Sequence, residues 1–249
     1  MRIPRFYLPI SLQTGLILDA PAKLLHHAVQ VLRLQEGEPL SVFNGTGGEY
    51  LAHLQAITKR SAQLLIGEFQ ADNKESKLDL TLVLAMIKPD KMDLALQKAV
   101  ELGIKAFQPL ITQRSVIRLA KDKQEKKQQH WEAIAISACE QCGRNQLPLI
   151  HKPLTLQDYL IQSSHTPRLI LTPNESSTLK QQARTFQQNP QSIKRLHLLI
   201  GPEGGFHKDE LDECLQAGVQ PISLGSRILR AETAAIASLS LAQACWGDL

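Results

Sequence analysis

The apolar and polar positions after residue 77 follow two alternating periods. Continuous apolar runs predict buried strands at 78–87, 106–111, 169–171, 196–200 and 222–224. Apolar residues at helical spacing predict helices at 91–102, 122–142, 156–161, 174–188 and 232–246. Strands that alternate with helices favour an α/β fold built on a parallel sheet.

The first 70 residues follow a different pattern. Short apolar runs predict strands at 2–8, 39–43, 50–57 and 62–69, with a glycine turn at 44–48 and helical spacing at 22–34. Such β-rich segments indicate a compact barrel. The polar stretch 71–77 marks a boundary, so we expect one domain at 1–73 and a second at 74–249.

Two glycine-bearing stretches, at 196–206 and 222–235, hold the candidate ligand-binding residues. Each is an apolar run followed by a glycine turn and a helical pattern, which is how a parallel strand leads into a ligand-binding loop. Glycine has no Cβ, so its backbone can approach a ligand closely. The glycines could instead simply end strands. A dinucleotide site is a weaker interpretation, because no Gly-x-Gly-x-x-Gly motif is present.

Charge is unevenly distributed, although the net charge is only +4. Residues 1–73 contain six basic and six acidic residues, 88–195 contain 17 and nine, and 196–249 contain three and seven. The central basic excess suits a polyanion such as RNA. A solvated helix face with interleaved acidic residues explains the cluster equally well.

Composition sets further limits. The 43% of hydrophobic residues is enough for a sizeable core. The chain has neither a run of about 18 apolar residues nor the pattern of a signal peptide, so we expect a cytoplasmic protein with no membrane partner. Cys139 and Cys142 have the spacing of half a zinc site, but no second pair follows at a ligand spacing, so we expect no metal.

Several ordered motifs together resemble one known family. Gly201-Pro-Glu-Gly-Gly-Phe206 and Leu224-Gly-Ser-Arg-Ile-Leu-Arg-Ala-Glu-Thr-Ala234 are similar to the C-terminal signature of the SPOUT methyltransferases. Met1-Arg-Ile-Pro-Arg5, Cys139-Glu-Gln-Cys-Gly-Arg-Asn145 and Gly247-Asp-Leu249 extend the resemblance nearly from end to end. They narrow it to the ribosomal RNA small-subunit methyltransferase E family.

The resemblance implies a fold and a function. It implies a C-terminal α/β domain with a deep trefoil knot, which topology rules alone would exclude, and an N-terminal PUA-like RNA-binding β-barrel. It also implies a homodimer, S-adenosylmethionine as the methyl donor, and N3 of a uridine in 16S ribosomal RNA of the small subunit as the acceptor, with no DNA partner. Two alternatives stay open: a non-catalytic ribosomal RNA adaptor, and a SPOUT enzyme with another RNA target.

The family's donor-binding positions match residues in three loops and the following helix. They are Leu171, Thr172, Pro173, Ile200, Gly201, Pro202, Glu203, Gly204, Gly205, Leu224, Gly225, Ile228, Leu229, Arg230, Thr233 and Ala234. We expect the backbone groups of these loops to read the edge of an adenine and the branched side chains to cover its faces.

The expected chemistry needs positive charge in the site. N3 of uridine is a poor nucleophile until its proton leaves, so an anion develops on the uracil. Arg230 is the expected electrostatic residue, because a guanidinium can face a uracil carbonyl bidentately. Glu203 and Glu232 are candidate bases, or partners that orient arginines.

Basic and polar residues outside the loops are candidates for RNA binding. They are Arg2, Arg5, Lys88, Lys91, Arg114, Arg118, Arg144 and Asn145. We expect Arg144 and Asn145 to reach either the RNA or the site of the second subunit of the dimer. Ordinary surface charge is the alternative explanation for Arg2 and Arg5. His207 occupies a place where relatives often carry a serine-type helix cap, and we expect it to cap less well.

Overall fold

A computed structural model describes residues 3–115, 123–162, 166–173, 177–179, 181 and 193–249. The chain forms two compact units, one of Met1–Glu75 with Cys139–Leu147 and one of Ser76–Ala138 with Pro148–Leu249. No helix within the described ranges is long and apolar enough to cross a membrane. The domain limits expected at residues 73 and 74 stay a prediction.

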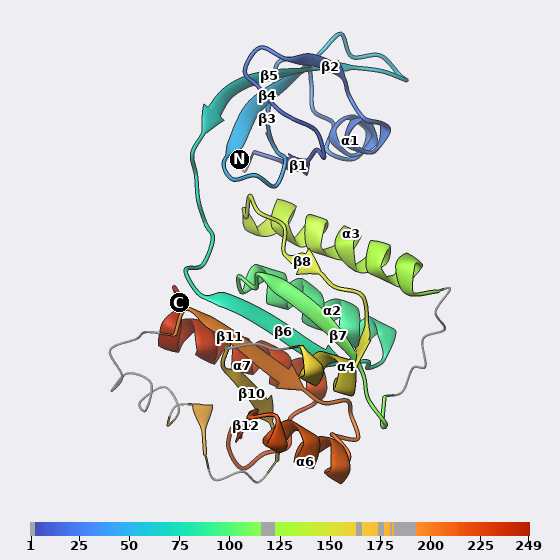
Figure 1. The fold of residues 1–249 in the computed structure, drawn as a ribbon. Coiled ribbons are helices and arrows are strands. Elements are labelled where there is room, and N and C mark those ends of the chain that lie inside the picture. The colour runs from blue at the N-terminus through green and yellow to red at the C-terminus, as the bar shows by residue number, and fades with distance from the viewer. Residues whose placement is uncertain (1–2, 116–122, 163–165, 174–176, 180, 182–192) are drawn as a thin grey trace. The chain divides into compact units, whose positions relative to one another are not determined.

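The first unit is built on a five-stranded sheet with the order β1-β3-β4-β5-β2 (Figure 1). Its strands are β1 (Arg5–Tyr7), β2 (Ile17–Asp19), β3 (Pro39–Phe43), β4 (Glu49–Gln55) and β5 (Gln63–Gln70). β1 pairs with β3 in parallel, and the other pairs are antiparallel. In β5, Leu64 and Ile66 alternate with less buried positions and enter the core. The predicted β-rich character is confirmed.

Two details of this unit differ from the sequence prediction. β2 was not predicted, because its three residues are too short to show a period. The helix expected at 22–34 divides into α1 (Ala22–Leu25) and a π-helix (His26–Val31). Leu24, Leu25 and Ala28 of this segment pack into the core of the sheet, so burial of the apolar face determines where the helix lies.

The second unit contains a parallel sheet with the strand order β12-β10-β11-β6-β7-β8. Its strands are β6 (Asp79–Ala85), β7 (Ala106–Ile111), β8 (Leu149–Ile150), β9 (Leu154–Thr155, paired with β7), β10 (Arg168–Leu171), β11 (Arg195–Ile200) and β12 (Gln220–Ile222). Every pair is parallel, so the predicted α/β class is confirmed. The trefoil knot stays a prediction.

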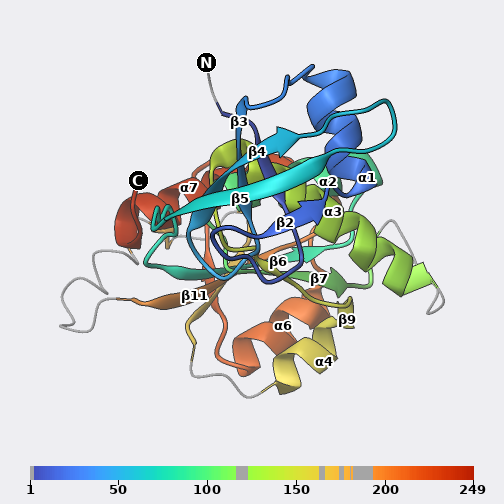
Figure 2. The same ribbon diagram turned by 90° about the horizontal axis from the view of Figure 1, so that it is seen from above.

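Helices cover both faces of this sheet. They are α2 (Pro89–Glu101), α3 (Gln124–Cys142), α4 (Leu156–Ile161), α6 (Lys208–Gln216) and α7 (Ala231–Trp246). α2 and α7 pack together on one face, whereas α4 and α6 lie on the other (Figure 2). On the α4–α6 face Leu110, Ile170 and Leu199 form a core with Tyr159 and Cys214. The helix expected at 174–188 falls mostly outside the described residues.

The carboxyl ends of three strands determine where the loops lie. β10 pairs with both β11 and β12, in register Ile170 with Leu199 and Leu171 with Ile222. Because parallel strands end at the same edge of a sheet, the segments after Leu171, Ile200 and Ile222 emerge together. Both glycine-bearing stretches are among them.

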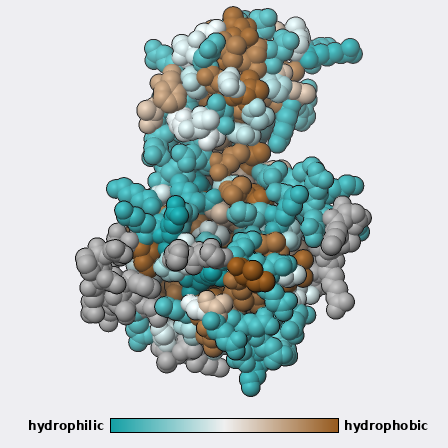
Figure 3. All heavy atoms as spheres, in the orientation of Figure 1, coloured by the Kyte–Doolittle hydropathy of each residue, from teal (hydrophilic) through white to brown (hydrophobic). Residues whose placement is uncertain are grey.

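Hydrophilic side chains cover most of the visible face, and apolar side chains are exposed in smaller areas (Figure 3). The large apolar residues with more than a third of their surface exposed include Leu94 of α2 and Leu241 of α7. Ile228, in the last glycine-bearing stretch, is 84% exposed, which leaves it available to a ligand or a partner.

Candidate functional site

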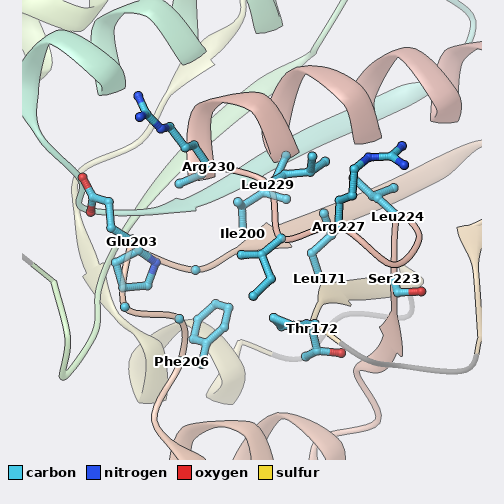
Figure 4. A pocket seen from close by; sticks show the side chains of 18 of the residues that line it. Leu171, Thr172, Ile200, Glu203, Phe206, Ser223, Leu224, Arg227, Leu229 and Arg230 are labelled. Carbon is cyan, nitrogen blue, oxygen red and sulfur yellow. The ribbon is translucent and has the colours of Figure 1, made fainter.

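One cavity of about 440 Å³ lies where the three loops meet. Figure 4 shows Leu171, Ile200 and Leu229 around its centre, with Phe206 at one edge. The lining residues are Arg114, Leu171, Thr172, Pro173, Ile200, Gly201, Pro202, Glu203, Gly204, Gly205, Phe206, Leu211, Ser223, Leu224, Gly225, Arg227, Ile228, Leu229, Arg230, Ala231 and Ala234. Of the residues predicted to bind the cofactor, only Thr233 is not in this lining. A volume of this size is typical of small-molecule sites.

The turn after β11 is a tight structure that needs two of its glycines. Gly205 N–H donates to Pro202 C=O at 2.8 Å, and Gly205 has φ of +67°, which residues with a Cβ rarely adopt. A Cβ on Gly201 would lie 3.0 Å from Cδ2 of Phe206. A Cβ on Gly204 would make only an ordinary contact, 3.5 Å from Cδ of Arg114. Gly201 therefore allows Phe206 to form one wall of the cavity.

The loop after β10 contributes the hydroxyl group of Thr172 to the cavity. Thr172 N–H donates to Ile222 C=O at 2.9 Å, which fixes the loop backbone to β12. Oγ1 of Thr172 is buried and has no hydrogen-bond partner within the described residues. A buried hydroxyl without a partner is costly, so this atom is suited to a ligand that supplies a polar group.

Two arginines place positive charge at the mouth of the cavity. Arg227 and Arg230 are both exposed and line it, and neither forms an ion pair within the described part of the chain. Arg230 is the N-cap residue of α7. In Figure 4 the side chains of Arg230 and Glu203 extend toward the same side of the cavity, and Arg227 lies on the other side.

The two candidate bases have different surroundings. Glu203 lines the cavity, and its Oε1 accepts a hydrogen bond of 3.3 Å from the backbone N–H of Lys88, just before α2. Glu232 is 8% exposed, is not in the lining, and its Oε1 lies 3.9 Å from Nζ of Lys91. The structure thus brings Glu203 to the cavity and places Glu232 against α2.

A polar pair joins β11 to α4. Nδ1 of His197, on β11, is 2.7 Å from the hydroxyl oxygen of Tyr159. Burial, and then the charge of Arg168, lowers the pKa of His197 to about 4, and burial raises the pKa of Tyr159. His197 is therefore neutral at physiological pH. Its hydrogen bond with Tyr159 connects α4 to the strand that leads into the glycine turn.

Three residues predicted to contact RNA have a structural role in the first unit. Arg144 is 3% exposed, and its guanidinium pairs with Glu75, with Nη2 to Oε2 at 2.7 Å. Asn145 is 1% exposed and accepts a hydrogen bond from Arg5, which also pairs with Glu49. Carboxylate and carbonyl groups of the first unit occupy the side chains of Arg5, Arg144 and Asn145, and their contact with RNA stays a prediction.

The other RNA candidates are placed differently. Lys88 and Lys91 lie at the start of α2, and the Lys88 side chain is exposed. Arg114 lines the cavity. Arg2 and Arg118 lie outside the described residues.

Cys139, the first residue of the cysteine pair found in the sequence, is buried. Burial raises the pKa of the Cys139 thiol to about 12, so it is unreactive. Among the described residues no group of three or more His, Cys, Asp or Glu could hold a metal.

His207 does cap α6: its Nδ1 accepts from Asp209 N–H at 3.3 Å, and its own N–H donates to Glu210 at 2.8 Å.

Sequence reasoning did not assign six of the lining residues to the cofactor site. They are Arg114, Phe206, Leu211, Ser223, Arg227 and Ala231. Phe206, Arg227 and Ala231 belong to the two motifs, so their position in the motif was an available signal. Leu211 and Arg114 come from other segments and are brought in only by the fold.

Known proteins resemble this chain over its length. A family model described as the RNA methyltransferase domain matches residues 74–243, and one described as the RNA methyltransferase PUA domain matches 21–67. Ribosomal RNA small subunit methyltransferase E of Buchnera aphidicola subsp. Schizaphis graminum is 33% identical over 249 residues, which cover 100% of this chain and 98% of the relative. The enzyme of that name from Rickettsia conorii is 37% identical over 87% of this chain and 84% of its own.

This chain belongs to the ribosomal RNA small subunit methyltransferase E family. A solved member of that name from Neisseria gonorrhoeae, bound to S-adenosylmethionine, is 34% identical with a TM-score of 0.88 over 100% of both chains. A methyltransferase from Legionella pneumophila, also in complex with S-adenosylmethionine, is 38% identical with a TM-score of 0.92 over 100% of both chains. Membership of the small subunit methyltransferase E family confirms the resemblance found in the motifs.

Proposed function

We propose that this chain transfers the methyl group of S-adenosylmethionine to N3 of a uridine in 16S ribosomal RNA. The observation that carries the proposal is the cavity that the three loops form at the carboxyl edge of the parallel sheet. Two relatives that share the fold over the whole chain were solved with this cofactor. The uridine N3 acceptor follows from the motif resemblance to the family.

The residues present fit the cofactor. Ile200, Leu224 and Leu229 offer apolar surface for an adenine. The hydroxyl of Thr172, which no other described residue contacts by a hydrogen bond, offers a polar contact. Gly201 keeps the turn close to Phe206, which closes one wall. When bound, the cofactor supplies an electrophilic methyl group on a positively charged sulfur.

The charged residues of the cavity perform the chemistry on the uridine. Arg230 stabilises the negative charge that develops on the uracil oxygens as the N3 proton leaves, because no ion pair with another described residue neutralises its guanidinium. Glu203 lies at the same side of the cavity and is the candidate acceptor of that proton. Glu232, away from the lining, orients Lys91 at the start of α2.

The remaining assignments concern partners. We assign RNA contacts to Lys88 and Lys91. Contacts of RNA with Arg2, Arg5, Arg118, Arg144 and Asn145 stay predictions. The N-terminal domain at 1–73 binds RNA, and the domain at 74–249 carries the methyl transfer. The chain forms a homodimer through α7, whose Leu241 is apolar and 44% exposed. It acts in the cytoplasm, where ribosomal RNA is modified, and needs no DNA, membrane or metal.

The test is a methyl-transfer assay with methyl-labelled S-adenosylmethionine and either 16S ribosomal RNA or small ribosomal subunits. After digestion, mass analysis of the nucleosides should show 3-methyluridine. A 2′-O-methylated nucleoside would instead identify an enzyme with another target. RNA binding with neither methyl transfer nor binding of the cofactor would identify a non-catalytic adaptor.

A further inference from the structure

A short turn at 112–115 follows β7 and contacts the glycine turn at 201–206 that lines the cavity. Ser115 N–H donates to Thr112 C=O at 3.1 Å, and Thr112 N–H donates to Oγ of Ser115 at 3.0 Å. These bonds fix the backbone between them. The turn therefore presents Gln113 and Arg114 in a defined direction.

The carboxylate of Glu210 joins this turn to the end of the glycine turn. Its Oε1 accepts from Gln113 N–H at 2.8 Å, and its Oε2 accepts from His207 N–H at 2.8 Å. Glu210 is only 4% exposed. Separation of the two backbone segments would leave a buried charged acceptor without a donor, which is costly. The two segments are consequently held together.

Arg114 adds contacts within the glycine turn itself. Its Nη1 donates to the carbonyl oxygen of Gly204 at 2.8 Å and lies 3.4 Å from that of Phe206. These two carbonyls stand on either side of Gly205, the residue with φ of +67°. The Arg114 guanidinium thus contacts carbonyl groups on both sides of Gly205, beside the wall formed by Phe206.

The geometry points to Arg114 as a positioning residue for the methyl donor, acting through the turn Gly201–Phe206. Hydrogen bonds from a charged donor favour the one conformation of the turn that shapes the cavity. Without them, the binding-competent conformation is less populated, and the apparent affinity for the ligand falls in proportion. The inference rests on the proposed function, because it assumes that the cavity binds S-adenosylmethionine. It replaces the sequence-based assignment of Arg114 to RNA.

The test is calorimetry with S-adenosylmethionine in the absence of RNA, on the full chain. Arg114→Ala should weaken binding about tenfold, which corresponds to about 1.4 kcal/mol. Arg114→Lys should recover part of the loss, because an ammonium can still donate to one carbonyl. Lys194→Ala is the matched control: it removes an exposed positive charge at the opposite end of β11 and should bind as the unaltered chain does.

Kinetics separate this role from a general loss of structure. Arg114→Ala should raise the KM for the methyl donor about tenfold while kcat at saturation stays within about twofold. Partial unfolding would instead reduce the binding stoichiometry and kcat, and would overturn the inference. So would unchanged donor affinity combined with weaker RNA binding and a smaller salt dependence, the result expected of a phosphate contact. If the unaltered chain does not bind S-adenosylmethionine, the proposed function itself fails.

Discussion

Gly201→Ala is the substitution for which the structure predicts the clearest effect on the cavity. The added Cβ would lie 3.0 Å from Cδ2 and 3.1 Å from Cε2 of Phe206, and 3.3 Å from its backbone nitrogen. Phe206 is 7% exposed, so its ring has little room to move. Overpacking of this kind costs about 1–3 kcal/mol. The turn can relax when empty but must return to bind, so affinity for S-adenosylmethionine should fall about 5- to 150-fold.

Calorimetry on the folded variant measures this loss, and Gly204→Ala is the matched control. A Cβ at Gly204 would be 3.5 Å from Cδ of Arg114, an ordinary contact, so this variant should bind within about twofold of the unaltered chain. Normal affinity of Gly201→Ala would show that the close approach of Gly201 to Phe206 is not needed for binding of the cofactor. Equal losses in both variants would show that any side chain in the turn is harmful, and that the Phe206 contact is not the cause.

Three further predictions concern charged and titratable residues. Arg230→Ala should lower the turnover number about 10²- to 10³-fold, the usual effect of removing one preorganised donor. An unchanged turnover number in steady-state kinetics would show that Arg230 has no electrostatic role in the reaction. Burial lowers the pKa of His197 to about 4, so the unfolded chain binds the proton first as pH falls. The free energy of unfolding should therefore fall by about 2 kcal/mol between pH 7 and pH 5. In urea unfolding, His197→Gln should not show this pH dependence. A variant that keeps it would show that another group is responsible. Glu75→Ala should lower the free energy of unfolding by about 3–5 kcal/mol, because it breaks a buried pair with Arg144. Lys74→Ala, from an exposed pair, should cost less than about 1 kcal/mol, and equal costs would contradict the structural role.

The fold class was predictable because the apolar runs are long enough to show a period. Strands such as Asp79–Ala85 and Arg195–Ile200 are buried along most of their length, which is typical of parallel strands. Strands of two or three residues, such as Ile17–Asp19 and Leu149–Ile150, carry too few positions for a pattern. Their pairing depends on neighbours distant in the sequence.

The lining of the cavity was predictable for a different reason. Most of its residues lie in two continuous motifs, Gly201–Phe206 and Leu224–Ala234, so a local resemblance identified them. The sequence does not show that Arg144 is paired, because its partner Glu75 is 69 positions away. Nor does it show that Arg114 contacts Gly204, which is 90 positions away.

A crystal structure of the chain with S-adenosylmethionine would locate the cofactor relative to the three loops. We expect the adenosine between the segments Leu171–Pro173, Ile200–Phe206 and Ser223–Leu229, with the methyl group on sulfur facing the side of Arg230. Cofactor bound elsewhere on the chain, or an empty cavity at a saturating concentration, would rule out this cavity as the donor site.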